Sequence, residues 1–290
     1  RCHCESGSYD MHPDMYIEDA LTEAEAAEGY VLTCQMIPES DCVIKVPTSS
    51  EACKVGKSVF KGKLQQLNVL SESTIHFGVE VDNPDALVFL PGQYVNVSIP
   101  DSNETRSYSF SSIPSANQAE FVVRNIPNGK MSTFLSDTAT IGQEINFEGP
   151  FGSFYLRPLI RPTLFLAGGT GIAPFLSMLK SLEVSGAHHP VRMVYGVTND
   201  FDLIEVEKLE EVKQNHPWFD YRTCVAAEDS SHERKGYVTS HVDNEWLNDG
   251  DVDVYLCGPL GMVDAVSNWL DSSNLKPSNF YYEKFTPSEQ

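Results

Sequence analysis

The sequence predicts a multidomain chain of the α+β and α/β classes, in which an antiparallel β-barrel precedes a parallel α/β domain. Two observations predict this fold. Residues 58–158 carry short strands at close spacing with one helix, a pattern typical of a small barrel. Residues 161–290 alternate apolar strands with helices, which indicates a parallel sheet covered on both faces. The 290 residues suffice for about two domains.

The barrel is predicted from alternation along its strands. Residues 74–81 (TIHFGVEV) and 94–99 (YVNVSI) alternate apolar and polar side chains, as half-buried antiparallel strands do. Other elements expected in this region are strands at 121–123 and 145–147 and a short helix that begins near Gly129, with 130–135 as its first turns.

The α/β region opens on a continuously apolar strand, 163–167 (TLFLA), which is typical of a strand buried on both faces. The elements expected after it are a helix over 172–182, a strand over 191–195, a helix over 203–214, strands over 221–226 and 252–257, a helix over 262–270 and a closing strand over 280–285.

The first 50 residues are acidic and weakly periodic. They predict a helix over 17–27, an apolar run over 30–34 and a strand over 42–46. Residues 47–57 (PTSSEACKVGK) have the composition of a linker. We therefore expect a boundary near residue 55.

The net charge of −21 comes from 41 acidic and 20 basic residues. Nucleic acid and anionic membranes would be repelled by this excess, so neither is expected as a partner. Two interpretations remain: a solvated acidic surface, or a field that steers a partner protein with a basic docking face.

Seven cysteines, an odd number, without the framework of a small secreted protein favour a reducing, cytoplasmic compartment. No apolar run approaches the length of about 18 residues that a membrane span needs. No signal peptide opens the sequence, which begins Arg1–Cys2–His3–Cys4. We expect the chain to be a fragment whose beginning is missing.

A glycine-rich turn, Gly168–Gly169–Thr170–Gly171, follows the first α/β strand, and Pro174 lies just beyond it. Amide groups at a helix start, backed by the helix dipole, favour a phosphate group. The alternative is a tight turn without a ligand. A second turn, Cys257–Gly258–Pro259, follows another apolar strand, so both turns should open onto one crevice at the carboxyl edge of the sheet.

The barrel segment Arg106–Ser107–Tyr108–Ser109 combines a cation, an aromatic ring and hydroxyl groups. A flavin needs these groups, for its phosphates, its flat ring system and its N5 atom. The alternative is an exposed strand with a surface arginine. Gly129–Lys130–Met131–Ser132 opens the predicted barrel helix and provides a second helix start for phosphate.

Taken in order, these segments and four others resemble the ferredoxin–NADP⁺ reductase superfamily over residues 58–285. The ordered set is much more specific than any single motif. The additional segments are Pro91–Gly92–Gln93–Tyr94, Gly149–Pro150–Phe151–Gly152, Ile172–Ala173–Pro174 and Glu283–Lys284–Phe285.

The resemblance implies an FAD site in the barrel. Arg106 would pair with the FAD phosphate, Tyr108 would stack on the isoalloxazine, and Ser109 would contact N5, with Ser107 in the same segment. The segment Gly129, Lys130, Met131 and Ser132 would hold the pyrophosphate. Phe285 would cover one face of the isoalloxazine ring until the nicotinamide of NADH displaces it.

The resemblance also implies an NADH site in the α/β domain, with Thr170 and Cys257 beside the nicotinamide C4 and Ser109 as the third catalytic residue. The remaining NADH contacts would come from Gly168, Gly169, Gly171, Pro174, Asp200, Gly258 and Pro259. Cys257 has the alternative interpretation of a small buried residue, and Glu283 that of a surface carboxylate. Asp200 suits a ribose 2′-hydroxyl and repels a 2′-phosphate, which favours NADH over NADPH.

The first 50 residues resemble the end of a plant-type [2Fe–2S] ferredoxin domain of β-grasp fold. Residues 29–34 match the segment with the fourth cluster ligand, which makes Cys34 that ligand. Such a cluster needs four thiolates, and the other three are missing from the chain. The spacing of Cys2 and Cys4 does not fit, and Cys4 could be the third ligand only in a disrupted loop. The cluster is therefore expected in a longer parent protein, with the cysteines here as free thiols.

The domain order, with Cys4–Glu5–Ser6–Gly7 and Tyr9–Asp10–Met11, is similar to the reductase components of benzoate and toluate 1,2-dioxygenases. Reductases of anthranilate dioxygenase and phenol hydroxylase are alternatives. The resemblance implies hydride transfer from NADH to FAD, then single electrons to a [2Fe–2S] centre and a terminal Rieske-type oxygenase. An alternative of another class is a non-catalytic flavin- or nucleotide-binding redox sensor.

Overall fold

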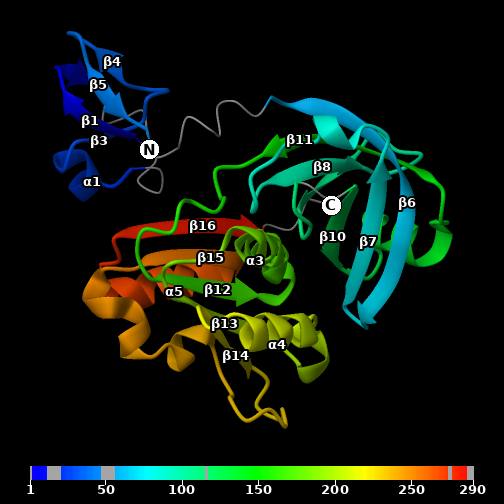
Figure 1. The fold of residues 1–290 in the computed structure, drawn as a ribbon. Coiled ribbons are helices and arrows are strands. Elements are labelled where there is room, and N and C mark those ends of the chain that lie inside the picture. Colours follow the sequence, from blue (N-terminus) through cyan, green and yellow to red (C-terminus); the bar gives the residue numbers. More distant parts are fainter. Residues whose placement is uncertain (1, 12–20, 47–55, 115–116, 274–275, 286–290) are drawn as a thin grey trace. The chain divides into compact units, whose positions relative to one another are not determined.

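A computed structural model describes residues 2–11, 21–46, 56–114, 117–273 and 276–285. The chain divides into two compact units, residues 1–55 and 56–290 (Figure 1). Residues 12–20 and 47–55 lie outside the described ranges, and with them most of the predicted linker and the start of the predicted helix over 17–27.

The first unit contains two small antiparallel sheets and one short helix. One sheet has the order β3 (Tyr30–Val31), β1 (Cys2–Ser6), β5 (Val43–Lys45), and the other pairs β2 (Tyr9–Asp10) with β4 (Ile37–Pro38). Helix α1 spans Glu23–Ala27.

Helix α1 begins at a capping box. The Thr22 hydroxyl accepts a hydrogen bond from the Glu25 amide at 3.3 Å, and the Glu25 carboxylate accepts one from the Thr22 amide at 2.9 Å. Leu21 and Val31 are fully buried in this unit. The resemblance to the end of a ferredoxin domain stays a prediction, since these short elements do not show that fold.

The second unit begins with six antiparallel strands in the order β10-β7-β6-β11-β8-β9. A bridge between Phe110 and Phe121 joins the two ends of this order, so the sheet closes as the sequence predicted. The strands are β6 (Ser58–Ser71), β7 (Thr74–Val81), β8 (Tyr94–Ser98), β9 (Thr105–Ser109), β10 (Gln118–Arg124) and β11 (Glu144–Phe151).

The barrel core is filled by the inward side chains of these strands and by one short helical segment. Phe77, Phe121 and Phe147 are at most 1% exposed. Helix α2 (Lys130–Thr133) runs into one π-helical turn, η4 (Phe134–Thr138), and a 3₁₀ turn, η3, spans Pro84–Ala86. The predicted helix therefore begins at the expected residue.

The rest of the second unit is a five-stranded parallel sheet of order β14-β13-β12-β15-β16, as predicted. Its strands are β12 (Thr163–Gly168), β13 (Val191–Val197), β14 (Phe219–Val225), β15 (Asp253–Pro259) and β16 (Asn279–Phe285). Its helices are α3 (Ala173–Ser185), α4 (Val206–Asn215), α5 (Leu260–Ser272) and the 3₁₀ segments η5 (Gly169–Ile172), η6 (Asp200–Asp202), η7 (Val238–His241) and η8 (Asn244–Gly250).

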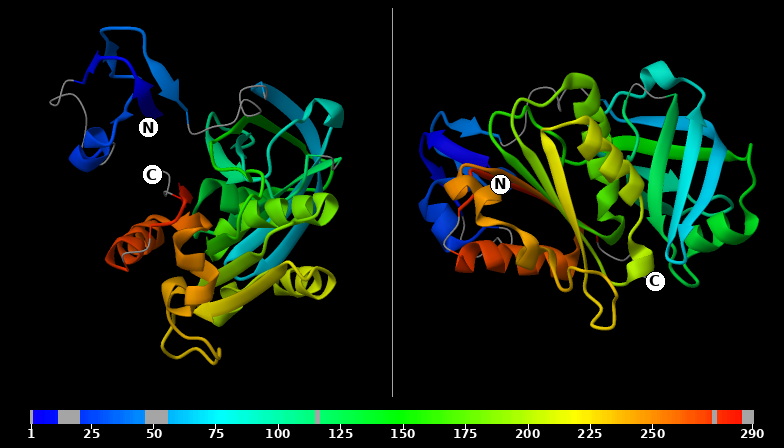
Figure 2. Two further views of the ribbon diagram at one scale, coloured as in Figure 1. Left: turned by 60° about the vertical axis from the view of Figure 1, so that its left-hand side comes forward. Right: turned by 60° about the horizontal axis from the view of Figure 1, so that its bottom comes forward.

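Helices cover both faces of the sheet: α3 and α4 lie on one face and α5 on the other (Figure 2). Along β12, Phe165 and Ala167 pack on the α3 side, whereas Leu164 and Leu166 pack on the α5 side. This explains why the strand is continuously apolar. Helix α4 begins at Val206 and not at residue 203, because residues 200–202 form a separate 3₁₀ turn and Glu205 has a left-handed φ of 58°.

The barrel and the α/β domain pack directly against each other. Val122 of β10 belongs to the same buried cluster as α3. Lys180 on α3 pairs with Glu120 on β10 at 2.9 Å, and the Ser177 hydroxyl donates to the Ser112 carbonyl at 2.5 Å. These contacts fix helix α3 to the edge of the barrel.

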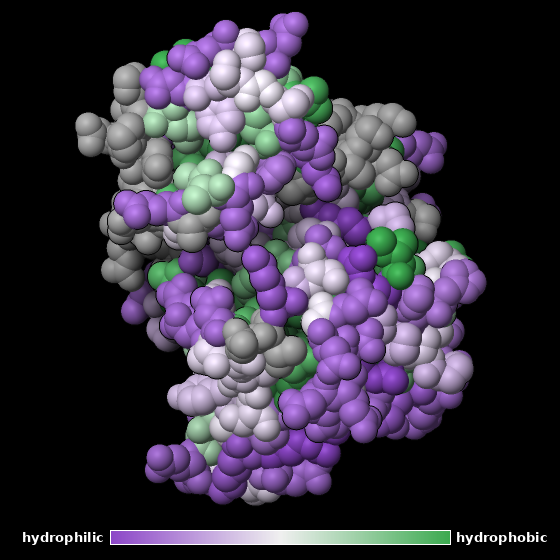
Figure 3. Space-filling model, turned by 90° about the vertical axis from the view of Figure 1, so that its left-hand side faces the viewer, coloured by the Kyte–Doolittle hydropathy of each residue, from purple (hydrophilic) through white to green (hydrophobic). Residues whose placement is uncertain are grey.

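Hydrophilic residues predominate on the face drawn in Figure 3, and its green hydrophobic areas are small and separate. This agrees with the net charge of −21. Within the described ranges, no helix combines the length and the apolar character needed to cross a membrane.

Candidate functional site

The first glycine turn follows strand β12 directly. Gly169 begins η5 with a φ of 55°, in the left-handed region that glycine adopts without steric penalty. Thr170 and Gly171 complete the turn, and Pro174 lies in the first turn of α3, where its missing N–H costs no helical hydrogen bond. Strand, turn and helix succeed one another as predicted.

The second glycine turn lies against the first because β12 and β15 are neighbours. Ala167 pairs with Cys257 in the parallel register. A Cβ at Gly171 would lie 2.3 Å from the Cys257 carbonyl oxygen, and a Cβ at Gly258 would lie 3.3 Å from the Cα of Gly168. The structure thus brings together the two glycine turns that the sequence assigned to NADH.

Residues from the barrel and from the α/β domain meet at Glu283. The Ser109 hydroxyl at the end of β9 donates to the Glu283 carboxylate at 3.1 Å. In the sheet, Glu283 pairs with Cys257, and Phe285 pairs with Pro259. Three residues far apart in the sequence, Ser109, Cys257 and Glu283, therefore form one group, and Glu283 is not a surface carboxylate.

This group is largely shielded from water. Ser109 is 4% exposed and Cys257 is fully buried. Burial raises the pKa of Glu283 to about 7, although the Ser109 hydrogen bond lowers it. Burial and the nearby Glu283 charge raise the pKa of the Cys257 thiol well above its usual value. Cys257 is thus a protonated, neutral thiol at physiological pH.

Two motifs of the barrel are joined beside this group. The Gln93 side chain donates to the Gly152 carbonyl at 3.1 Å and accepts from the Leu90 amide at 2.8 Å. Tyr94 stacks on Phe151 with ring centroids 5.7 Å apart. A Cβ at Gly152 would lie 3.0 Å from the Tyr94 ring and 3.5 Å from the Glu283 carboxylate, so both side chains border this glycine. Desolvation and the charge of Glu283 raise the pKa of Tyr94.

Two cations converge at the other end of β9. Glu104 accepts a hydrogen bond from Arg106 at 3.0 Å and also pairs with Lys130 at the start of α2. These interactions lower the pKa of Glu104. Arg106 and Lys130, which the sequence assigned to phosphate groups, are therefore held beside each other by one carboxylate. The Ser107 hydroxyl donates to Asn96 at 2.8 Å.

The remaining residues of the predicted flavin site also make contacts within the barrel. Tyr108 is half-buried, with its ring edge-on to Phe77 at a centroid distance of 6.2 Å. Met131 is 3% exposed and packs in the barrel core. The Ser132 hydroxyl accepts from the Ile126 amide at 2.9 Å, so it shapes the turn before α2.

Asp200 lies in the turn after β13 and is bound to the loop after β14. Its carboxylate accepts hydrogen bonds from Ser230 at 2.9 Å and from Ser231 at 3.5 Å. Sequence reasoning found Asp200 from its position after the second strand, but the two serines are about thirty positions away and carried no signal of their own.

Arg124 is a residue that sequence reasoning missed. It ends strand β10, and its guanidinium Nη1 lies 4.0 Å from where a Cβ of Gly169 would be. Among the described residues, no carboxylate pairs with this guanidinium. A cation next to the glycine turn suits a phosphate group. The available signal was an arginine five residues before Gly129, at the end of a strand.

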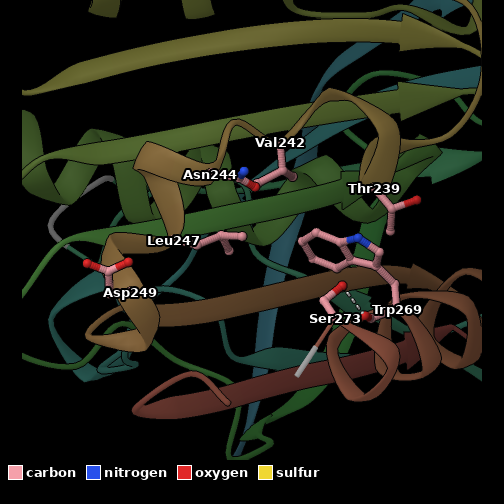
Figure 4. Close-up of a pocket in the computed structure, with 7 residues that line it drawn as sticks. All are labelled: Thr239, Val242, Asn244, Leu247, Asp249, Trp269 and Ser273. Carbon is pink, nitrogen blue, oxygen red and sulfur yellow. Dashed lines mark hydrogen bonds between the residues drawn. The ribbon is translucent and has the colours of Figure 1, made fainter. Parts of the chain in front are cut away.

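An open pocket of about 470 Å³ lies away from these residues, between α5 and the segment 239–249 (Figure 4). None of the residues assigned to FAD or NADH lines it. The contacts around Glu283 join the flavin and nicotinamide motifs, whereas this pocket contains neither motif. Its lining residues are Thr239, Val242, Asn244, Leu247, Asp249, Trp269 and Ser273.

Known proteins and families match both domains of the second unit. Residues 61–155 match the oxidoreductase FAD-binding domain, and residues 165–268 match the oxidoreductase NAD-binding domain. The toluate 1,2-dioxygenase electron transfer component of Pseudomonas putida is 49% identical over 99% of this chain and 85% of the relative. The chain belongs to the ferredoxin–NADP⁺ reductase family.

Further relatives agree with this family. The 2-halobenzoate 1,2-dioxygenase electron transfer component of Burkholderia cepacia is 47% identical over 98% of this chain and 84% of its own length. Among solved structures, a ferredoxin–NADP⁺ reductase from Plasmodium falciparum has a TM-score of 0.66 at 20% identity, covering 78% of this chain and 96% of that one. The latter similarity supports the fold.

The barrel of this family member fits an FAD molecule. Arg106 and Lys130 present two adjacent cations, and Tyr108 presents a half-buried ring on the same strand as Arg106. The Ser111 hydroxyl is 2% exposed and has no hydrogen-bond partner among the described residues. A buried polar atom without a partner is costly, so a bound polar group would stabilise it.

The described residues of the first unit do not form a complete [2Fe–2S] site. Cys34 is exposed, in the turn after β3. Within the described ranges, no three His, Cys, Asp or Glu side chains lie close enough to share a metal ion. The Cys4 thiol donates to the Ser6 carbonyl at 3.3 Å, and that of Cys42 donates to Ser8 at 3.4 Å. The assignment of Cys34 as a ligand stays a prediction.

Proposed function

We propose that this family member is an NADH-dependent flavoprotein reductase of an aromatic-ring-hydroxylating dioxygenase system. It takes hydride from NADH onto FAD and delivers electrons to a terminal oxygenase. The observation that carries this proposal is the contact of Ser109 with Glu283, beside Cys257. It joins the strand with the flavin motif to the strands with the nicotinamide motif.

The residues act by positioning the reactants. When bound, FAD accepts a hydride from the reduced nicotinamide and supplies electrons to one-electron acceptors. Ser109 is the hydroxyl at the flavin side, and Thr170 and the neutral Cys257 flank the nicotinamide side. Packing around the buried strand ends excludes water, and Ser109, Thr170 and Cys257 would hold the two rings close enough for hydride transfer.

In this proposal Arg106 and Lys130 bind the FAD phosphates. In the structure, both side chains pair with the Glu104 carboxylate. Arg124 and the amides of the turn 168–171 hold the NADH pyrophosphate, and Asp200 accepts a ribose hydroxyl. Phe285, which is half-buried beside Pro259, covers the flavin until nicotinamide enters.

The partner that we propose is a Rieske-type terminal oxygenase. Support comes from the two relatives at 49% and 47% identity, both of which are electron transfer components of 1,2-dioxygenases. These two relatives favour a dioxygenase as the partner over the alternative of a phenol hydroxylase. The acidic surface suits a basic docking face on that partner.

For the arrangement of the chain we propose an FAD-binding barrel over 58–158, an NAD-binding domain over 161–290, and the last part of a ferredoxin-like domain over 1–50. We also propose a cytoplasmic location. Its support is that the cysteines of the described residues are all free thiols.

The test is reduction of bound flavin. The chain loaded with FAD should be yellow, should bleach when NADH is added without oxygen, and should reduce ferricyanide with NADH. A protein that takes up no FAD, or whose FAD is not reduced by NADH, would contradict the proposed function.

A further inference from the structure

The tip of the β6–β7 hairpin reaches from the barrel to the α/β domain. Strand β6 ends at Ser71 and strand β7 begins at Thr74, so Ser73 lies in the turn of this hairpin (Figure 1). The Ser73 hydroxyl donates to the carboxylate of Asp202, in the turn after β13. Leu70 packs against the same buried cluster as α3. The hairpin tip is thus a second attachment point, separate from Lys180 and Glu120.

Asp202 is the anchor of the turn that it belongs to. It is 5% exposed, and one of its carboxylate oxygens accepts hydrogen bonds from the Asn199 amide and side chain, each at 3.1 Å. The buried Tyr195 hydroxyl donates to the Asp202 carbonyl at 3.2 Å. The other carboxylate oxygen accepts the hydrogen bond from the Ser73 hydroxyl. A change at Ser73 therefore acts on the whole turn 199–202.

This turn also carries Asp200, which is bound to Ser230 in the loop after β14. A continuous series of contacts thus runs from the barrel through Ser73 and Asp202 to Asp200 and Ser230. The barrel binds the flavin, and the turn lies at the end of the second strand, where the adenosine half of the dinucleotide is proposed to bind. This hairpin tip therefore fixes the position of the proposed adenosine site relative to the flavin site.

We propose that Ser73 and Asp202 are positioning residues for NADH: they fix the turn that binds the adenosine half at a set place relative to the barrel. The inference rests on the proposed function. Neither side chain touches the reacting atoms in this proposal. A hydride donor without the adenosine half gains nothing from the turn, so its reaction should not depend on Ser73.

The test compares two hydride donors on the FAD-loaded chain. Anaerobic stopped-flow measures reduction of the bound flavin by NADH and by reduced nicotinamide mononucleotide, which lacks the adenosine half. Ser73→Ala should lower the second-order rate constant for NADH about tenfold, the usual effect of losing a hydrogen bond to a charged group. The rate with the mononucleotide should stay within about twofold of wild type. A change of that size is smaller than the usual effect of losing one hydrogen bond.

Two variants serve as controls. Ser73→Thr keeps the hydroxyl and should restore the NADH rate. Ser272→Ala removes an exposed hydroxyl at the end of α5, which bonds only the Trp269 carbonyl, and should leave both rates unchanged. An unchanged NADH rate in Ser73→Ala, or an equal loss with both donors, would overturn the inference while the proposed function stands. Wild-type flavin that neither donor reduces would overturn the proposed function and this inference together.

Discussion

The ionisation of Glu283 depends on its surroundings in the folded chain. Burial beside the Ser109 hydroxyl raises the pKa of this carboxyl from 4.5 to about 7. A carboxyl whose pKa is raised on folding binds its proton more tightly in the folded state. Its contribution to stability is complete below about pH 4.5 and is lost as the pH rises through about 7.

Replacement of Glu283 by glutamine should remove this pH dependence. Relative to Glu283→Gln, the free energy of unfolding of the wild-type apoprotein should fall by about 3 kcal/mol between pH 4.5 and about pH 8. Denaturant unfolding at a series of pH values measures the difference. Ser109→Ala should shift the fall to higher pH, because the Ser109 hydrogen bond lowers this pKa. A difference that is constant with pH would contradict the assignment.

Arg124 should act on NADH and not on FAD, because its guanidinium lies next to Gly169 in the first glycine turn. We expect Arg124→Ala to raise the KM for NADH about tenfold with little change in kcat, since a charge-assisted contact to a phosphate is lost. Ferricyanide reduction with NADH measures both constants. Arg124→Lys should recover part of the affinity. An unchanged KM, or loss of bound FAD, would show that Arg124 has another role.

At the scale of elements, contact between the glycine turns depends on the absence of a side chain at Gly171. A Cβ there would lie 2.3 Å from the backbone of Cys257, which belongs to a central strand and cannot shift freely. The strand β15 and the turn η5 therefore approach to a distance that only glycine permits.

Gly171→Ala should destabilise the chain by about 1–3 kcal/mol, as overpacking of a buried contact does, and should weaken NADH binding. The matched control is Gly261→Ala in helix α5, where a Cβ would meet nothing within 4 Å. That change should be neutral or slightly stabilising, because alanine is the better helix former. Thermal unfolding of both variants is the measurement, and equal effects would refute the close-contact explanation.

At the scale of the whole second unit, the barrel and the α/β domain are joined by polar contacts across a packed seam. Glu120 lies between His76 on β7 and Lys180 on α3. The nearby His76 ring, 4.0 Å away, and the hydrogen bond from Lys180 at 2.9 Å lower the pKa of this carboxyl to about 2. The stability that the carboxylate contributes is present above about pH 4.5 and is lost as the pH falls towards 2.

Lys180→Met should therefore cost about 1 kcal/mol or less near neutral pH, because the pair is partly exposed to solvent. The difference from wild type should shrink as the pH falls from about 4.5 towards 2, where Glu120 of the folded wild type becomes protonated. Calorimetry between pH 7 and the acid transition tests this. A difference that grows in acid would contradict the role of the ion pair.

Features that depend only on neighbouring residues could be predicted from the amino-acid sequence. Apolar strands, the glycine turn 168–171 and the helix start at Gly129 follow from local patterns, and their order identified the family. The sequence placed the beginning of α4 wrongly, because the left-handed residue Glu205 and the separate turn 200–202 override the helical pattern of 203–205.

Contacts between residues far apart in the sequence could be found only from the three-dimensional packing. Glu283 reaches Ser109 because β16 lies at one edge of the parallel sheet, beside β15, and the sheet edge meets the barrel. Ser73 and Asp202, 129 positions apart, meet through the packing of a hairpin tip on a turn. Local patterns fix backbone conformation, but contacts between domains depend on long-range packing, which leaves no periodic signal in the chain.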